Sequence, residues 1–157
     1  MTSSDPGSRT GPAESALGVD MNLEVVTLPV ADVDRSKAFY ESLGWRLDID
    51  LVISDELRTV QFTPPHSGCS VQFGKGRTTA QPGSAQAMIL VVKDIDAVRT
   101  DLIGRGADVG EVQEMKPPGF DAPGRSYFAR ASFSDPDGNS WELQEITTRL
   151  PGRTWAD

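Results

Sequence analysis

The chain has 157 residues, of which 38% are hydrophobic, and its 23 acidic and 15 basic residues give a formal net charge of −8. This length suits one domain, or two small modules that share one core. The negative charge argues against a surface for DNA or RNA, because such surfaces need clustered Lys and Arg. We therefore expect no nucleic-acid partner.

The compartment is indicated by two further features. A single cysteine, Cys69, excludes an intramolecular disulfide and fits a reducing environment. No stretch approaches the roughly 18 apolar residues of a membrane helix, and the N-terminus lacks a basic-then-apolar signal pattern. The expectation is a cytoplasmic protein without a membrane partner.

The chain divides into a leader, a patterned domain and a tail. Residues 1–20 are mainly Ser, Gly, Pro, Thr and Ala, a composition that predicts a disordered leader. Residues 21–148 are expected to form one domain of two modules, 21–76 and 85–148. Residues 149–157 are left as a C-terminal tail.

The first module is predicted to begin with a strand over 23–30. Asp32 is placed to cap a helix that runs to about Leu43 and ends at Gly44. Three more strands are expected over 45–52, 57–63 and 70–73.

The second module is predicted to begin with a strand over 87–92. A helix follows from about Asp94 to Arg105, with one apolar face made by Ile95, Val98, Leu102 and Ile103. A weak strand over 109–114 and a Pro/Gly loop over 115–125 come next. The module ends in a hairpin of strands 127–134 and 140–146, joined by the turn sequence Asp135-Pro136-Asp137-Gly138-Asn139.

A repeat relates the two modules. The segment Val30-Ala31-Asp32-Val33-Asp34 recurs as Val92-Lys93-Asp94-Ile95-Asp96, so that each aspartate is followed by its counterpart 62 residues later. The same offset relates Leu28 to Leu90 and Gly44 to Gly106. This long period predicts a duplicated unit. The predicted fold is therefore α+β, with two tandem βαβββ modules.

Several of these segments together resemble the glyoxalase/bleomycin-resistance/dihydroxybiphenyl-dioxygenase group, the vicinal oxygen chelate superfamily. They are Asp32-Val33-Asp34-Arg35-Ser36, Phe39-Tyr40, Leu43-Gly44-Trp45 and the segment from Asp135 to Leu143. The resemblance covers about residues 22–147. It implies a glyoxalase-like fold whose curved sheets surround a shared cavity, and members often dimerise, so a homodimer is consistent with it.

Strand alternation assigns side chains to the cavity side or the helix side of each sheet. The cavity side is expected to carry Val25, Thr27, Gln72, Ala87, Glu142 and Gln144, among others.

The resemblance implies four positions where the family's enzymes carry metal ligands, and here they are Val25, Gln72, Ala87 and Glu142. Two of these side chains are aliphatic, the Gln72 amide is a weak ligand, and Glu142 is the only anion. The single histidine, His66, lies in a Pro-Pro-His-Ser-Gly turn away from them. We therefore expect no metal or other cofactor, and no metal-dependent glyoxalase, extradiol dioxygenase or fosfomycin-type activity.

The remaining candidates each allow more than one role. Three roles are open for Glu142. It is a general base with a raised pKa, a counter-ion for a cationic ligand, or a remnant of the family's ligand position that is bonded to Gln72 or water. Tyr127 and Arg125 lie at the end of the long loop. One interpretation makes Tyr127 a proton donor and Arg125 a clamp for an anion, and the other makes both ordinary residues of the cavity rim. Trp45 stacks on a flat ligand or belongs to the core.

Two functions follow from these candidates, besides a regulatory or structural role without ligand chemistry. The first is a protein without the metal site that binds a small apolar or cationic organic molecule. Its candidate ligand-binding residues are Val25, Thr27, Trp45, Gln72, Ala87, Arg125 and Gln144. The alternative is a metal-independent lyase or isomerase with Glu142 as general base, assisted by Tyr127.

Overall fold

The computed structural model describes residues 18–119, 124–150 and 153–155. One compact unit comprises Leu23–Thr148, and a second comprises residues 1–22 and 149–157. Most of the predicted leader, residues 1–17, lies outside the described residues. Within the described residues, all helices and strands belong to the unit Leu23–Thr148.

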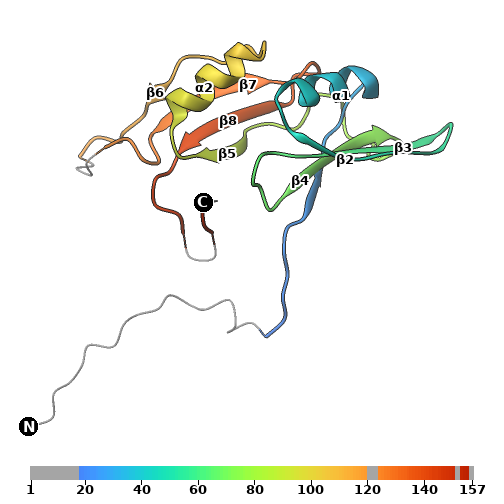
Figure 1. The fold of residues 1–157 in the computed structure, drawn as a ribbon, viewed down its shortest axis with the longest axis horizontal. Helices are drawn as coiled ribbons and strands as arrows, with labels where there is room; N and C mark the ends of the chain where they lie inside the picture. The colour runs from blue at the N-terminus through green and yellow to red at the C-terminus, as the bar shows by residue number, and fades with distance from the viewer. Residues whose placement is uncertain (1–17, 120–123, 151–152, 156–157) are drawn as a thin grey trace, which may run out of the picture. The chain divides into compact units, whose positions relative to one another are not determined.

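The first module contains one helix and one four-stranded sheet (Figure 1). Its elements are β1 (Val25–Thr27), α1 (Val33–Ser42), β2 (Arg46–Ser54), β3 (Leu57–Thr63) and β4 (Ser70–Lys75). The strand order is β1-β4-β3-β2, with β1 parallel to β4 and the other neighbours antiparallel.

The second module repeats this arrangement. Its elements are β5 (Met88–Val92), α2 (Ile95–Gly104), β6 (Gln113–Glu114), β7 (Ala129–Ser134) and β8 (Ser140–Glu145). The strand order is β5-β8-β7-β6, with β5 parallel to β8. The prediction of an α+β fold built from two βαβββ modules is confirmed. Among the described residues, neither helix is long and apolar enough to cross a membrane.

The repeated aspartates begin the two helices. The Asp32 side chain accepts a hydrogen bond from the Arg35 amide at 3.0 Å, and the Asp94 side chain accepts one from the Ala97 amide at 3.1 Å. Each bond satisfies an N–H group that lacks a partner inside the helix. Gly44 and Gly106 follow the helix ends with φ of +80° and +94°, a conformation that costs glycine little.

Some predicted details are wrong. β1 comprises only Val25–Thr27; Pro29, which has no N–H, cannot continue the ladder at its C-terminal end. Ala87 lies before β5 and has a φ of +55°, so it is not part of that strand. Ile103 is exposed, whereas its neighbour Leu102 is buried, so the apolar face of α2 is narrower than predicted.

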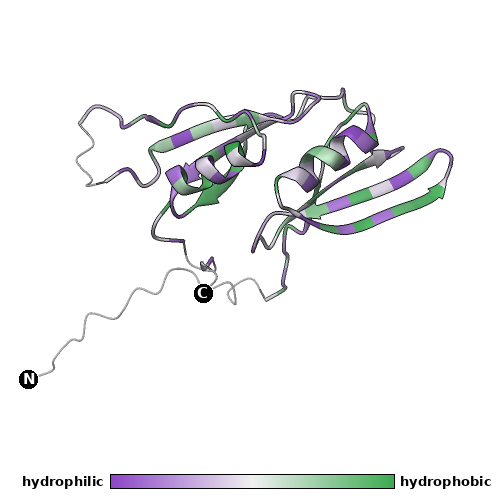
Figure 2. Cartoon of the chain, turned by 45° about the horizontal axis from the view of Figure 1, so that its top comes forward, coloured by the Kyte–Doolittle hydropathy of each residue, from purple (hydrophilic) through white to green (hydrophobic). Residues whose placement is uncertain are grey.

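The core of the first module lies between α1 and its sheet. Tyr40, Phe62 and Phe73 are completely buried there, and the Tyr40 ring lies 5.6 Å from the Phe73 ring between centroids. Along β2 and β3, hydrophobic and hydrophilic residues alternate (Figure 2). On β3 this period of two places Val60 and Phe62 on the face covered by α1, where both are completely buried, whereas no residue of β2 is buried. The opposite face of the two strands has no described helix over it (Figure 1).

The turn at residues 135–139 joins the two modules. One carboxylate oxygen of Asp135 accepts the amides of Asp137 and Asn139, each at 2.9 Å. The other oxygen accepts the Tyr40 hydroxyl at 2.9 Å and the Asn139 side-chain amide at 2.8 Å. The Trp141 indole N–H donates to the Tyr40 hydroxyl at 3.0 Å. Burial and the charge of Asp135 raise the pKa of Tyr40, so its hydroxyl remains a proton donor.

A second group of bonds at this turn reaches the start of α1. The Asp137 carboxylate accepts the Ala31 amide and the Arg35 guanidinium, each at 3.0 Å. The sequence indicated only a tight turn here, and the structure shows that the same residues hold the modules together.

Candidate functional site

The helix-free face of the first sheet carries a polar network. The Gln72 side-chain amide donates to the Thr27 hydroxyl at 2.8 Å, which places these two candidates together across the parallel β1–β4 pair. Val25 is paired with Ser70 in the same register. The Ser70 hydroxyl lies 2.6 Å from that of Thr63.

Asp48 completes this network and was not among the predicted site residues. Its carboxylate accepts bonds from Arg46, Thr63 and Gln61. Desolvation by itself would raise the pKa of Asp48, but these hydrogen bonds outweigh it and lower the pKa below its usual value. The face therefore holds a stable anion between the cation Arg46 and the neutral donors Thr63 and Gln61.

Glu142 lies on the corresponding face of the second sheet, where it forms an ion pair with Arg130. In the strand register, Ile89 is its neighbour on β5 and Ser132 its neighbour on β7. Arg130 was not among the residues predicted to face the cavity, and the structure places this cation directly beside Glu142. Strand alternation along β7 would have shown that Arg130 and Ser132 share this face.

Arg125 contacts three carboxylates at the end of the long loop. Its guanidinium lies 3.2 Å from the Glu145 carboxylate and 3.8 Å from that of Glu114, and it also pairs with Asp96. The hydrogen bond that Arg125 donates to the Asp96 carboxylate is the main reason that the pKa of Arg125 is raised. Because Glu145 also accepts the Ile95 amide at 3.0 Å, Arg125 anchors the loop end to β8 and α2.

Tyr127 adopts a φ of +72°, which is strained for a residue other than glycine. Its amide donates to the Glu145 carbonyl at 2.6 Å, and its carbonyl accepts the Gln144 side-chain amide at 3.0 Å. Its side chain is exposed. Strained residues of this kind concentrate at functional sites, so Tyr127 remains a candidate beside Gln144.

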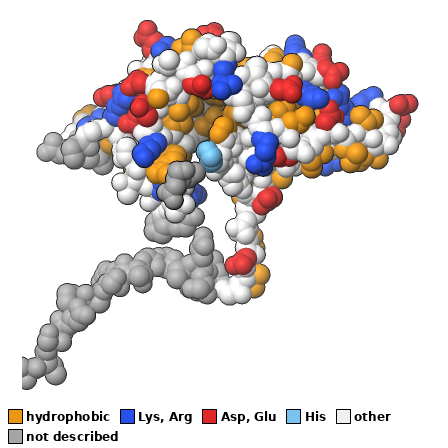
Figure 3. All heavy atoms as spheres, viewed as in Figure 1, with side chains coloured by type: hydrophobic (Ala, Val, Ile, Leu, Met, Phe, Trp, Pro, Cys, Tyr) orange, Lys and Arg blue, Asp and Glu red, His pale blue; other side chains and the backbone are white. Residues whose placement is uncertain are grey.

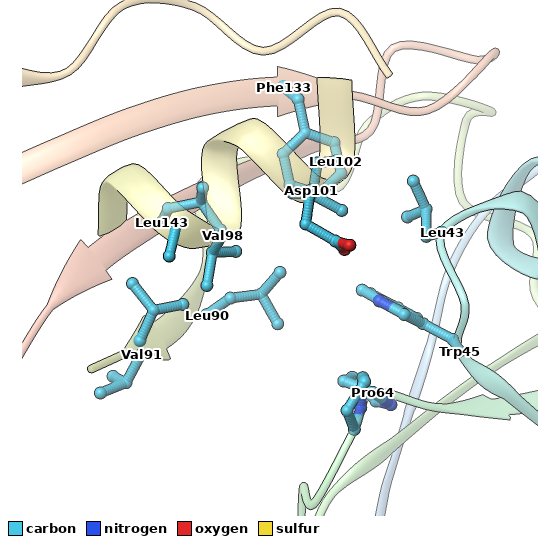
Figure 4. Close-up of a pocket in the computed structure, with 13 residues that line it drawn as sticks. Leu43, Trp45, Pro64, Leu90, Val91, Val98, Asp101, Leu102, Phe133 and Leu143 are labelled. Atoms are coloured by element: carbon cyan, nitrogen blue, oxygen red, sulfur yellow. The ribbon is translucent and has the colours of Figure 1, made fainter. Parts of the chain in front are cut away.

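A cavity of about 350 Å³ lies between the helix side of the second sheet and the loop and strand ends of the first module. Of the predicted site residues, only Trp45 lines it (Figure 4). The Trp45 ring is buried and meets the Trp141 ring edge-on at 5.1 Å. This cavity is not lined by the side chains that were predicted to face a cavity on the strands, namely Val25, Thr27, Gln72, Glu142 and Gln144.

The sequence matches the model of the Glyoxalase/Bleomycin resistance protein/Dioxygenase superfamily over residues 22–143. The chain belongs to this superfamily. No curated protein matches it.

Solved structures of the superfamily share the fold. TnmS3, an antibiotic-binding protein from Streptomyces sp. CB03234, is 28% identical, with a TM-score of 0.65 over 81% of this chain and 97% of its own. A superfamily member from Sphaerobacter thermophilus is 27% identical, with a TM-score of 0.63 over 80% of this chain and 98% of its own. The fosfomycin resistance protein FosX from Listeria monocytogenes is 15% identical, with a TM-score of 0.56 over 81% of this chain and 94% of its own. This last likeness concerns the fold alone.

The residues at the superfamily's metal-ligand positions do not fit a divalent ion. Val25 and Ala87 have no donor atom, the Gln72 amide is bonded to Thr27, and Glu142 is paired with Arg130. Within residues 18–119, 124–150 and 153–155, no three His, Cys, Asp or Glu side chains gather as a metal site would require.

Proposed function

We propose that this protein binds a small apolar or cationic organic molecule on the helix-free faces of its sheets, without a metal ion. The observation that carries the proposal is the pairing of Ile89 with Glu142 in the strand register. Ile89 is 51% exposed, so an apolar surface lies directly beside a carboxylate on an open face. An apolar body with a positive charge complements that combination.

Two further findings support this class of ligand. The net charge of −8 attracts cations over a long range. TnmS3, with which the chain shares 28% identity, is an antibiotic-binding protein, and antibiotics are small organic molecules. The Arg130–Glu142 ion pair is the group for which a cationic ligand would compete.

We further infer that a second copy of the chain covers these faces. Hydrophobic side chains gather over the β2–β3 hairpin at the right-hand end of the view (Figure 3). On the helix-free side of β2, Ile49 is 41% and Leu51 52% exposed. A surface of this kind favours an apolar partner. A homodimer would bury this hydrophobic surface and enclose the ligand.

We also place the protein in the cytoplasm, with which its single cysteine is consistent.

The substitution Glu142→Gln tests the proposal with ethidium, a flat cation, and phenanthridine, its neutral parent ring system. We expect Glu142→Gln to weaken ethidium binding about tenfold, the effect of about 1.4 kcal/mol from one charged contact, and to leave phenanthridine binding unchanged. Fluorescence anisotropy measures the first affinity and competition the second. Glu56→Gln, at the exposed β2–β3 turn, is the matched control and should change neither.

Equal ethidium affinities for Glu142→Gln and Glu56→Gln would contradict the proposed role of Glu142. An enzyme that used Glu142 only as a general base would keep its ligand affinity after this substitution and lose turnover.

A further inference from the structure

The cavity beside α2 is separate from the sheet faces of the proposed function. It is bounded by Trp45 and Pro64 from the first module and by Val98, Leu102 and Phe133 from the second. These side chains are apolar, and the cavity volume of about 350 Å³ lies within the range of sites for small organic molecules. A compact apolar body therefore fits the lining.

One carboxylate in the lining makes this cavity suited to a positively charged ligand. Asp101 is the only charged side chain among its described lining residues. Figure 4 shows its carboxylate extending from α2 into the space between Leu43 and Trp45. A cation placed there would contact the carboxylate, which attracts positive charge, with the Leu43 and Trp45 side chains beside it.

The neighbouring arginine leaves part of this carboxylate available. The Arg105 guanidinium pairs with Oδ2 of Asp101 at 3.0 Å. The Arg105 guanidinium also packs closely against Gly44: a Cβ atom added at Gly44 would lie only 2.8 Å from Nη1 of Arg105. Oδ1 of Asp101 makes no hydrogen bond with any described residue of the chain. An incoming ammonium group can therefore bond to Oδ1 without displacing Arg105.

We propose that this cavity is a second binding site, one for a small aromatic or aliphatic amine in its protonated form. The apolar part contacts Trp45, Val98 and Phe133, and the ammonium group bonds to Asp101. Anions are excluded by the carboxylate, and neutral apolar molecules of the same size bind more weakly.

Benzylamine at pH 7 and benzyl alcohol form the probe pair, because they match in size and differ in charge. In a titration followed by amide and indole NMR signals, benzylamine should shift the Trp45 indole signal and the amides of residues 97–102. Asp101→Asn should weaken benzylamine binding about tenfold and leave benzyl alcohol binding unchanged. Asp55→Asn, at the exposed β2–β3 turn, is the matched control and should change neither.

Val98→Phe fills the cavity and should abolish binding of both probes, whereas Glu142→Gln should affect neither. This last variant separates the second site from the proposed function. Shifts confined to β4 and β8, equal affinities of the two probes, or equal effects of Asp101→Asn and Asp55→Asn would each overturn the proposal.

Discussion

Asp135→Ala is expected to lower the free energy of unfolding by about 3–5 kcal/mol, the usual cost of breaking a buried charged network. The substitution leaves the Tyr40 hydroxyl, two backbone amides and the Asn139 side-chain amide without their acceptor. Asp135 is only 5% exposed, so water does not readily replace the lost bonds. A loss of this size is comparable with the whole stability of a small domain, about 5–15 kcal/mol.

Urea unfolding followed by circular dichroism measures this effect. Asp55→Ala removes an exposed carboxylate from the β2–β3 turn and should change stability by less than about 0.5 kcal/mol. A loss below about 1 kcal/mol in Asp135→Ala, close to that of the control, would mean that the bonds at this turn do not hold the modules together.

Trp141→Ala is expected to cost about 3–5 kcal/mol, because it removes a large buried ring and leaves a cavity. The Trp141 ring packs edge-on against Trp45 at 5.1 Å and stacks on Phe133 at 6.4 Å, so it connects the two modules. Both of these neighbours line the cavity beside α2. The substitution should therefore also weaken benzylamine binding there.

Trp141→Phe separates the two contributions of this side chain. It keeps most of the packing but removes the N–H that donates to Tyr40, and its expected cost is about 1–2 kcal/mol. Thermal unfolding of both variants measures the difference. If Trp141→Ala were as stable as Trp141→Phe, ring packing between the modules would contribute little.

Much of the fold could be predicted because its signals are local. Asp32 and Asp94 cap their helices through bonds to residues three positions away, and Gly44 and Gly106 follow the helix ends. β3 begins and ends at the predicted residues, since turns bound it and Val60 and Phe62 alternate with polar residues. The pairing of Thr27 with Gln72 likewise agrees with their predicted common face.

The contacts between distant segments could not be predicted in this way. The bond from Tyr40 to Asp135 spans 95 residues, and no local pattern indicates it. Arg125 was considered as a clamp for an anionic ligand, but its partners Asp96 and Glu145 come from other elements of the second module. The positive φ angles of Ala87 and Tyr127 are also imposed by their surroundings, because their residue types do not favour them.

The cavity beside α2 illustrates the same limit. Its lining combines Pro64 from the first module with Val98 and Phe133 from the second, and each of these residues by itself indicates ordinary packing. Only the docking of the two modules turns this packing surface into a cavity. The position of Asp101 on an exposed part of α2 gave no signal of its orientation.

We propose that this chain combines the superfamily's fold with a set of side chains that does not hold a divalent metal ion. Elemental analysis after dialysis against Zn²⁺, Ni²⁺, Mn²⁺ and Fe²⁺, with unbound ions removed, tests it most directly. We predict less than about one ion per ten chains for each metal, because Val25 and Ala87 supply no ligand atom. A content near one ion per chain that disappears in Glu142→Gln would contradict the claim.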